Sequence, residues 1–290
     1  MSGNRCARAG VLLSLLLAPI AAAAQGTPSL VLHHLRVGLD SATWKDVHDS
    51  PFLREQFSAF DSVRVEGGGA TTLRQLFTGR RNWLEVVRGV GPATIELGLT
   101  NDDASSVSRV VAAWRRDGIA FDSSAVGRPD GQHAAPWYLR WAVRGGANAM
   151  FGVELDAYHP LLFRRLAEWD SLPPDLQDRV RALRPHFAPE RLFSEITGAT
   201  LAIPVEEIRG LRNALRGGGV QVVDEGEGLV VLFTDGVRLR FVPAWNQPGL
   251  RRLEFYLTRA VPANPIYRLG QHSRLRFGPG RVAAWDFDLP

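Results

Sequence analysis

The chain has 290 residues and a net charge of +4 at pH 7, and its 30 acidic residues are interspersed with its basic ones. Lys45 is the only lysine, and no block of five or six basic residues occurs, so we expect no nucleic-acid partner. Cys6 is the only cysteine, so no intramolecular disulfide can form and the fold must depend on its hydrophobic core. The length suffices for one large domain or two of ordinary size.

The first 24 residues are typical of a secretory signal. Arg5 and Arg8 precede an apolar run, Val11–Ala24, which ends in small residues. The run is shorter than the about 20 apolar residues that a membrane span needs. We therefore expect cleavage after Ala24 and a periplasmic or secreted mature protein without a stable membrane span.

The first structural unit follows this segment. Residues 29–40 alternate between apolar and polar side chains as a strand does, and residues 41–60 carry apolar side chains at helical intervals. Strand-like stretches follow at 72–78 and 82–88. This order predicts a β-α-β-β unit with room for one more strand.

Residues 93–159 repeat the same order. Residues 93–100 alternate as a strand, and Asp102 or Asp103 is placed to cap a helix that ends at Gly118. The remaining strands of this unit are predicted at Ile119–Val126, Trp137–Val143 and Ala149–Tyr158. The repetition predicts that residues 29–159 form a pair of related units.

A helical connector that prolines interrupt is predicted over residues 160–190, and it is the strongest candidate for a domain boundary. Residues 191–290 predict a second pair of units, with a helix at Val205–Arg216 and a short helical stretch near Pro265–Gly270. The predicted fold is therefore α+β, built from tandem βαβββ units that pair into two cupped mixed sheets.

The histidines of the first strand are separated by parity, because successive strand residues point to opposite faces. His34 shares a face with Arg36, whereas His33 shares the opposite face with the apolar residues of the strand. We therefore expect His34, and not His33, to be available as a ligand.

Three acidic residues occupy positions that match between the first two units. His34 and Glu96 each lie six residues before an aspartate, at the start of corresponding strands. Glu85 and Glu154 each interrupt an apolar closing strand, where a carboxylate is costly to bury unless it is paired or metal-bound. The pattern predicts that these four side chains converge.

Ion pairing is the alternative to metal binding for these carboxylates. The candidate partners of Glu85 are Arg80, Arg81 and Arg88, and those of Glu154 are Arg140 and Arg144. In the second pair of units, the corresponding positions hold Thr200, Arg240, Glu254 and Asp286. We expect that pair to have a structural or ligand-shaping role.

The segments HHLRVGLD and NWLEVV resemble the opening and closing strands of the vicinal oxygen chelate superfamily, the glyoxalase and bleomycin-resistance fold. The chain is also similar to a bacterial group described as glyoxalase-related. In the superfamily, β-α-β-β-β modules pair into a cupped sheet, and metal ligands come from the first and last strand of each module. The resemblance covers about residues 29–159, and residues 191–290 only by strand order.

Carried over by position, the resemblance implies His34, Glu85, Glu96 and Glu154 as ligands of a divalent ion such as Zn, Mn or Ni. It implies a lyase or isomerase acting on a small oxygenated molecule, with Glu154 or Glu96 moving a proton and Arg36 binding an anionic group. The superfamily often has a second His or a Gln where this chain has Glu96.

The alternative is a metal-free protein of the same fold that binds or sequesters a small molecule. Its cup would be lined by Trp83, Trp137, Tyr158 and Arg36. Because one scaffold hosts many kinds of site, the fold does not decide between the two.

Overall fold

The computed structural model of the chain describes residues 30–67, 70–89, 95–127, 136–143, 149–173, 178–245, 247–262 and 265–287. The expected signal segment, residues 1–24, lies outside them. Within the described ranges, no helix combines the length and the apolar character needed to cross a membrane.

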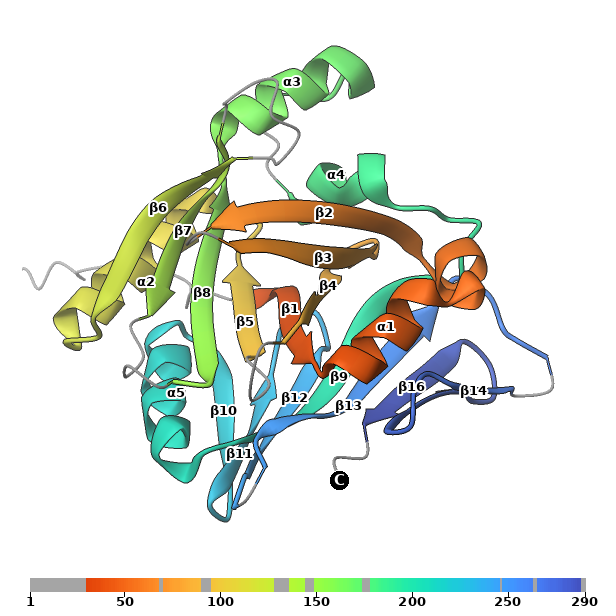
Figure 1. Cartoon of the computed structure of the whole chain (residues 1–290). Helices are drawn as coiled ribbons and strands as arrows, with labels where there is room; N and C mark the ends of the chain where they lie inside the picture. The colour runs from red at the N-terminus through yellow and green to blue at the C-terminus, as the bar shows by residue number, and fades with distance from the viewer. Residues whose placement is uncertain are drawn as a thin grey trace, which may run out of the picture.

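The first sheet has eight strands in the order β2-β3-β4-β1-β5-β8-β7-β6 (Figure 1). Its elements in chain order are β1 (Val31–Leu39), α1 (Ser41–Asp49), a π-helical turn (Leu53–Phe57), β2 (Ala59–Gly67), β3 (Ala70–Thr78), β4 (Trp83–Arg88), β5 (Ile95–Thr100), α2 (Ala104–Arg116), β6 (Phe121–Gly127), β7 (Pro136–Val143) and β8 (Phe151–Tyr158). β1 and β5 pair antiparallel at the centre, with Leu35 opposite Leu97. Each of them pairs in parallel with the last strand of its own unit, β4 or β8.

The second sheet repeats the strand order as β10-β11-β12-β9-β13-β16-β15-β14. Along the chain, the connector between the two sheets contains α3 (Pro160–Asp170), α4 (Arg179–Leu183) and a 3-10 turn (Arg184–His186). The elements that follow are β9 (Phe193–Ile203), α5 (Val205–Gly217), β10 (Gln221–Glu225), β11 (Gly228–Leu232), β12 (Arg238–Pro243), β13 (Gly249–Leu257), β14 (Ile266–Arg268), β15 (Ser273–Phe277) and β16 (Val282–Phe287). The predicted α+β class with paired mixed sheets is confirmed.

The helix predicted over residues 41–60 is divided in the structure. The helix α1 ends at Asp49, because Ser50 precedes Pro51 and has the extended backbone that a following proline favours. Helical turns resume over residues 51–57. Phe60, the last residue of the predicted helical stretch, lies in β2 instead. The strand β2 is the further strand for which the prediction left room without giving its residues.

The short helix predicted near Pro265–Gly270 is wrong, because β14 (Ile266–Arg268) is a strand. A parallel pair of strands requires a crossover connection, usually a helix. The fourth unit has none within the described residues, and β16 accordingly pairs antiparallel to β13, whereas β8 is parallel to β5. The last three strands of the fourth unit thus run opposite to their counterparts in the first sheet.

One hydrophobic core joins the two sheets. Buried side chains of α1, α2 and α5 form a single cluster with apolar residues from both sheets. Figure 1 shows α5 beside β8 and β10, with the second sheet below the first in that view. The connector helices α3 and α4 lie outside this core, where Phe163 and Ala182 pack against Tyr158 of β8.

Trp114 provides a test of this shared core. Its indole Nε1 donates a hydrogen bond of 2.9 Å to the carbonyl oxygen of Ala214, and so joins α2 to α5. Trp114→Phe removes this hydrogen bond, while the carbonyl keeps the Gly218 N–H as a donor at 3.1 Å, so the free energy of unfolding is expected to fall by about 1 kcal/mol. Urea unfolding followed by circular dichroism measures the change. Trp245→Phe is the control, because Trp245 is 73% exposed and should have no effect.

Candidate metal centre

Three side-chain atoms converge at the centre of the first sheet. His34 Nε2 lies 3.7 Å from Glu96 Oε1 and 3.8 Å from Glu154 Oε2. The three atoms are buried, and none of them has a hydrogen-bond partner in the described part of the chain. The structure therefore brings together three of the four predicted ligands.

This geometry fits a divalent cation. Atoms bound to one ion at about 2.1 Å cannot be more than about 4.2 Å apart, and the distances from His34 Nε2 to the two carboxylate oxygens lie below that limit. One imidazole nitrogen with two carboxylate oxygens is a donor set that suits Zn, Mn or Ni. Buried polar atoms are normally hydrogen-bonded, so His34 Nε2 and Glu96 Oε1, which have no hydrogen bond within the described residues, fit coordination to a cation.

The imidazole of His34 is held by its neighbours in the sheet. Its ring stacks on Trp83 of β4, with ring centroids 4.8 Å apart and planes 11° from parallel. In β5 the residue opposite His34 is Gly98, and a Cβ atom at that position would overlap the His34 ring. Glycine at 98 therefore makes room for the histidine.

The prediction that His33 faces away from the site is wrong. The pairing of β1 with β5 shifts register between Leu32 and His34, which is a β-bulge. The extra residue interrupts the alternation, so both histidine side chains reach the same cluster. His33 Nδ1 lies 2.9 Å from Asp156 Oδ2, and His33 Nε2 lies 2.8 Å from the Tyr158 hydroxyl.

Asp156 supports both histidines, and sequence reasoning did not select it. Its carboxylate lies 3.6 Å from His34 Nδ1 in addition to its bond with His33. Burial lowers the pKa of His33 to about 4, so this imidazole is neutral. Burial opposes ionisation of Asp156, but the hydrogen bond from His33 keeps its pKa below the usual value. His33 Nδ1–H therefore donates to Asp156, and Tyr158 donates to His33 Nε2.

The structure places the fourth predicted ligand, Glu85, against arginines. Its Oε1 lies 3.0 Å from Arg36 Nε and 2.9 Å from Arg74 Nη1. Arg36 also forms an ion pair with Glu96. The partners that we named for Glu85 are wrong, since Arg81 pairs with Glu195 and Arg88 donates to Ser41.

The two-fold arrangement of the sheet explains the difference between Glu85 and Glu154. The paired residues Leu35 and Leu97 lie at the centre of this two-fold arrangement. On one side of them His34 lies opposite Gly98, and on the other side Arg36 lies opposite Glu96. Arg36 therefore occupies in β1 the place that Gly98 occupies in β5. Its guanidinium bridges Glu85 and Glu96.

Glu154 forms the ion pair with Arg140 that we named as the alternative; Arg144 lies outside the described residues. Arg140 Nε is 2.7 Å from Glu154 Oε2, but its N–H hydrogen bond goes to Asp156 Oδ1 at 3.2 Å. Burial, and then the charge of Glu96, raise the pKa of Glu154. Burial also opposes ionisation of Glu96, but His34 and Arg36 outweigh it and hold its pKa below the usual value.

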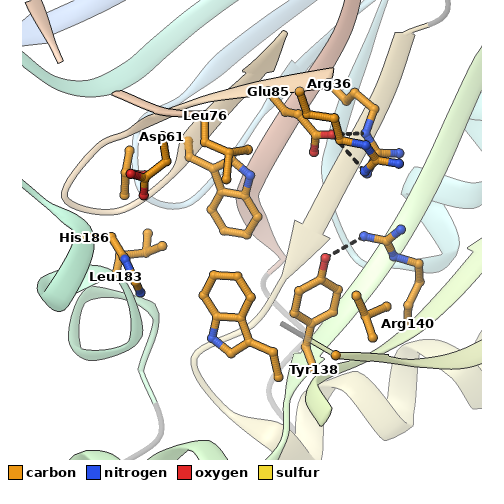
Figure 2. A pocket seen from close by; sticks show the side chains of 14 residues that line it. Arg36, Asp61, Leu76, Glu85, Tyr138, Arg140, Leu183 and His186 are labelled. Atoms are coloured by element: carbon orange, nitrogen blue, oxygen red, sulfur yellow. Dashed lines mark hydrogen bonds and ion pairs between the residues drawn. The ribbon is translucent and has the colours of Figure 1, made fainter. Parts of the chain in front are cut away.

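A cavity of about 300 Å³ opens beside this cluster. Figure 2 shows Arg36 and Glu85 near Arg140 and Tyr138, with Leu183 and His186 across the cavity. The last two residues come from the connector after β8, which covers this side of the sheet. Trp83, Trp137 and Arg36 line the cavity as expected. Tyr158 is not among its lining residues; its hydroxyl binds His33.

The second sheet lacks such a cluster among its described residues, since both groups of His, Asp and Glu with metal-like spacing lie in the first sheet. Thr200 and Arg240 are neighbours across β9 and β12. Arg252 forms ion pairs with both Glu254 and Asp286. The acidic pair of the fourth unit is therefore neutralised within the sheet.

Residues 32–287 match the model of DUF5829, which is described as a family of unknown function. The chain belongs to this family. No curated protein sequence matches the chain.

Solved structures similar to the chain include a Mn(II)-bound glyoxalase from Novosphingobium aromaticivorans, with 13% identity, a TM-score of 0.42, and coverage of 88% of this chain and 80% of that one. They include the 2,3-dioxygenase LapB from Pseudomonas sp. KL28, with 12% identity, a TM-score of 0.43, and coverage of 91% and 94%. A variant of 4-hydroxymandelate synthase from Streptomyces coelicolor matches with 15% identity, a TM-score of 0.42, and coverage of 77% and 70%. No residue role follows from these matches.

Proposed function

We propose that this chain is a glyoxalase-like protein that binds one divalent metal ion through His34, Glu96 and Glu154. We further propose that it acts as a lyase or isomerase on a small, oxygenated, anionic molecule in the adjoining cavity. The observation that carries the proposal is the convergence of three buried ligand atoms, with Glu96 Oε1 and Glu154 Oε2 both within 3.8 Å of His34 Nε2. In keeping with residues 1–24, we propose a periplasmic or secreted location.

The residues around the cavity fit this class of substrate. Arg36 and Arg140 place positive charge at one side of the cavity, where a carboxylate or enolate oxygen would bind. Trp83 and Trp137 supply an apolar wall that excludes water from the ligand. A bound divalent ion would supply Lewis-acid stabilisation of a negatively charged oxygen. Glu154 and Glu96 are the side chains placed to hold or move a proton beside it.

Metal analysis tests the proposal. The full chain, stripped with a chelator and dialysed against Zn, Mn or Ni, is expected to retain about one ion per molecule by mass spectrometry. His34→Ala removes the only imidazole of the set and should abolish retention. His272→Ala is the matched control, because His272 lies in the second half and should leave retention unchanged. Wild-type protein that retains no ion would contradict the proposal.

A metal-free binding protein is the second candidate, and the arginines favour it. Arg36, Arg74 and Arg140 together contact Glu85, Glu96 and Glu154, so these carboxylates already have positive partners. In that case, the stripped protein should still bind small anions in the cavity. Isothermal titration with aromatic and aliphatic carboxylates, in the presence of chelator, distinguishes this candidate from the first.

A further inference from the structure

The connector holds a buried arginine whose contacts bear directly on the histidines. Arg179, the first residue of α4, is 3% exposed. Its Nη1 donates a hydrogen bond of 2.9 Å to the carbonyl oxygen of Leu32. Its Nη2 donates a hydrogen bond of 2.8 Å to Asp235 Oδ2. One side chain thus joins the first strand, the connector and the second sheet.

The contact with Leu32 falls at the β-bulge. The register of β1 against β5 shifts between Leu32 and His34, and a bulge disrupts the local ladder of backbone hydrogen bonds. A buried carbonyl group needs a donor, and Arg179 provides one at this point. The bulge brings His33 and His34 into one cluster, so the carbonyl that Arg179 binds is part of the structure that orients them.

Asp235 is the charged partner that makes a buried arginine tolerable at this place. It lies in the turn between β11 and β12, its side chain is 6% exposed, and its Oδ1 also accepts from the backbone N–H of Val237. Asp102 accepts a hydrogen bond of 3.1 Å from the Arg179 backbone N–H, but its carboxylate is half-exposed and 3.5 Å from Arg179 Nε, so it balances the guanidinium charge less than Asp235 does. The second sheet therefore supplies the main counter-charge.

We propose that Arg179 is a positioning residue that fixes the bulge at His33 and His34, and that Asp235 of the second sheet holds Arg179 in place. The second sheet thereby acts on a site to which it contributes no ligand. This inference rests on the proposed function only insofar as His34 is a metal ligand, because the orientation of the two imidazoles can be measured without metal.

The test compares two carboxylates that join the halves of the molecule. Asp235→Asn removes the charge that holds Arg179. Glu195→Gln is the matched control, because Glu195 pairs with Arg81, its side chain is 11% exposed, and it also joins the second sheet to the first. Imidazole ¹H–¹⁵N NMR spectra of the metal-free full chain report the hydrogen bond of His33 Nδ1 and the environment of His34. Zn(II) affinity is measured by competition with a chelating dye.

Asp235→Asn is expected to shift the imidazole signals of His33 and His34 and to weaken Zn(II) binding about tenfold, as loss of a supporting contact does at metal sites. Glu195→Gln should leave both unchanged. Arg179→Lys is the second variant: it keeps the positive charge beside Asp235 but loses the fork that reaches Leu32, and it should shift the same two signals.

Unchanged imidazole signals in both Asp235→Asn and Arg179→Lys would overturn the proposal, and so would equal shifts in Glu195→Gln. If the wild-type chain binds no Zn(II), the proposed function fails, and the NMR comparison alone decides this inference.

Discussion

Replacing Gly98 with alanine is expected to abolish metal retention at His34, Glu96 and Glu154. The added Cβ would overlap the His34 ring, which cannot move away freely because its other neighbour is the stacked indole of Trp83. Overpacking of this kind costs about 1–3 kcal/mol in a well-packed interior. We therefore expect a lower midpoint of urea unfolding and loss of the ion measured by mass spectrometry.

Gly152→Ala is the matched control for this substitution. Gly152 lies opposite Glu96 in the neighbouring strand β8, and a Cβ there would come no nearer than 3.6 Å to the Glu96 side chain. This is ordinary contact, so the variant should keep its metal and most of its stability. If Gly98→Ala retained metal as well as Gly152→Ala does, the placement of His34 as a ligand would be wrong.

Replacing Arg36 with glycine is expected to have opposite effects on the metal-free and metal-loaded protein. The substitution gives β1 the residue that β5 has at the matching position, and it releases Glu85 and Glu96 from their shared guanidinium. Without metal, Glu96 loses its arginine partner and Glu85 keeps only Arg74, so the free energy of unfolding should fall by about 3 kcal/mol. With Zn(II), Glu85 becomes available as a further ligand, and the affinity should rise about tenfold.

Thermal unfolding with and without Zn(II), together with the dye competition, measures both effects. Arg74→Ala is the control, because Arg74 contacts Glu85 but leaves Arg36 in its bridging position. It should lower stability slightly without strengthening metal binding. An Arg36→Gly protein that binds Zn(II) no more tightly than Arg74→Ala would show that Arg36 does not keep Glu85 out of the site.

Much of the fold could be predicted from the sequence because periodicity and turn residues repeat along the chain. The positions of α2 and α5, of the closing strands β4 and β8, and of the connector agree with it. The proximity of His34 to Glu96 and Glu154 could also be predicted from their matching positions in the two units. His34 and Glu96 lie close together because β1 pairs with β5, and Glu154 joins them because β5 pairs with β8. These features depend on local patterns that a single sequence contains.

The role of His33 was not predicted because parity was applied across a bulge. Little in the sequence indicates the bulge, because Leu30, Val31 and Leu32 are consecutive apolar residues and all three are buried. Such a run has no parity that could be compared with that of Leu35 and Val37.

The arginine contacts of Glu85 depend on tertiary structure and had no local signal. Arg74 lies in β3, and it reaches Glu85 only because β3 pairs with β4. Asp156 shares its strand face with Glu154, and the sequence alone does not distinguish the two carboxylates. A long, flexible side chain such as that of Arg36 also has several partners within reach, and only packing selects among them.

The reversed direction of β16 affects how the fourth unit is compared with the other three. An alignment that follows chain order matches β16 to β8 from first residue to last, although the two strands enter their sheets from opposite ends. Such an alignment matches Asp286, near the C-terminal end of β16, with a residue near the C-terminal end of β8, and these two residues lie at opposite ends of their strands in space. Ligand positions in relatives of this chain can therefore be transferred into this unit only by superposing coordinates, not by counting along the sequence.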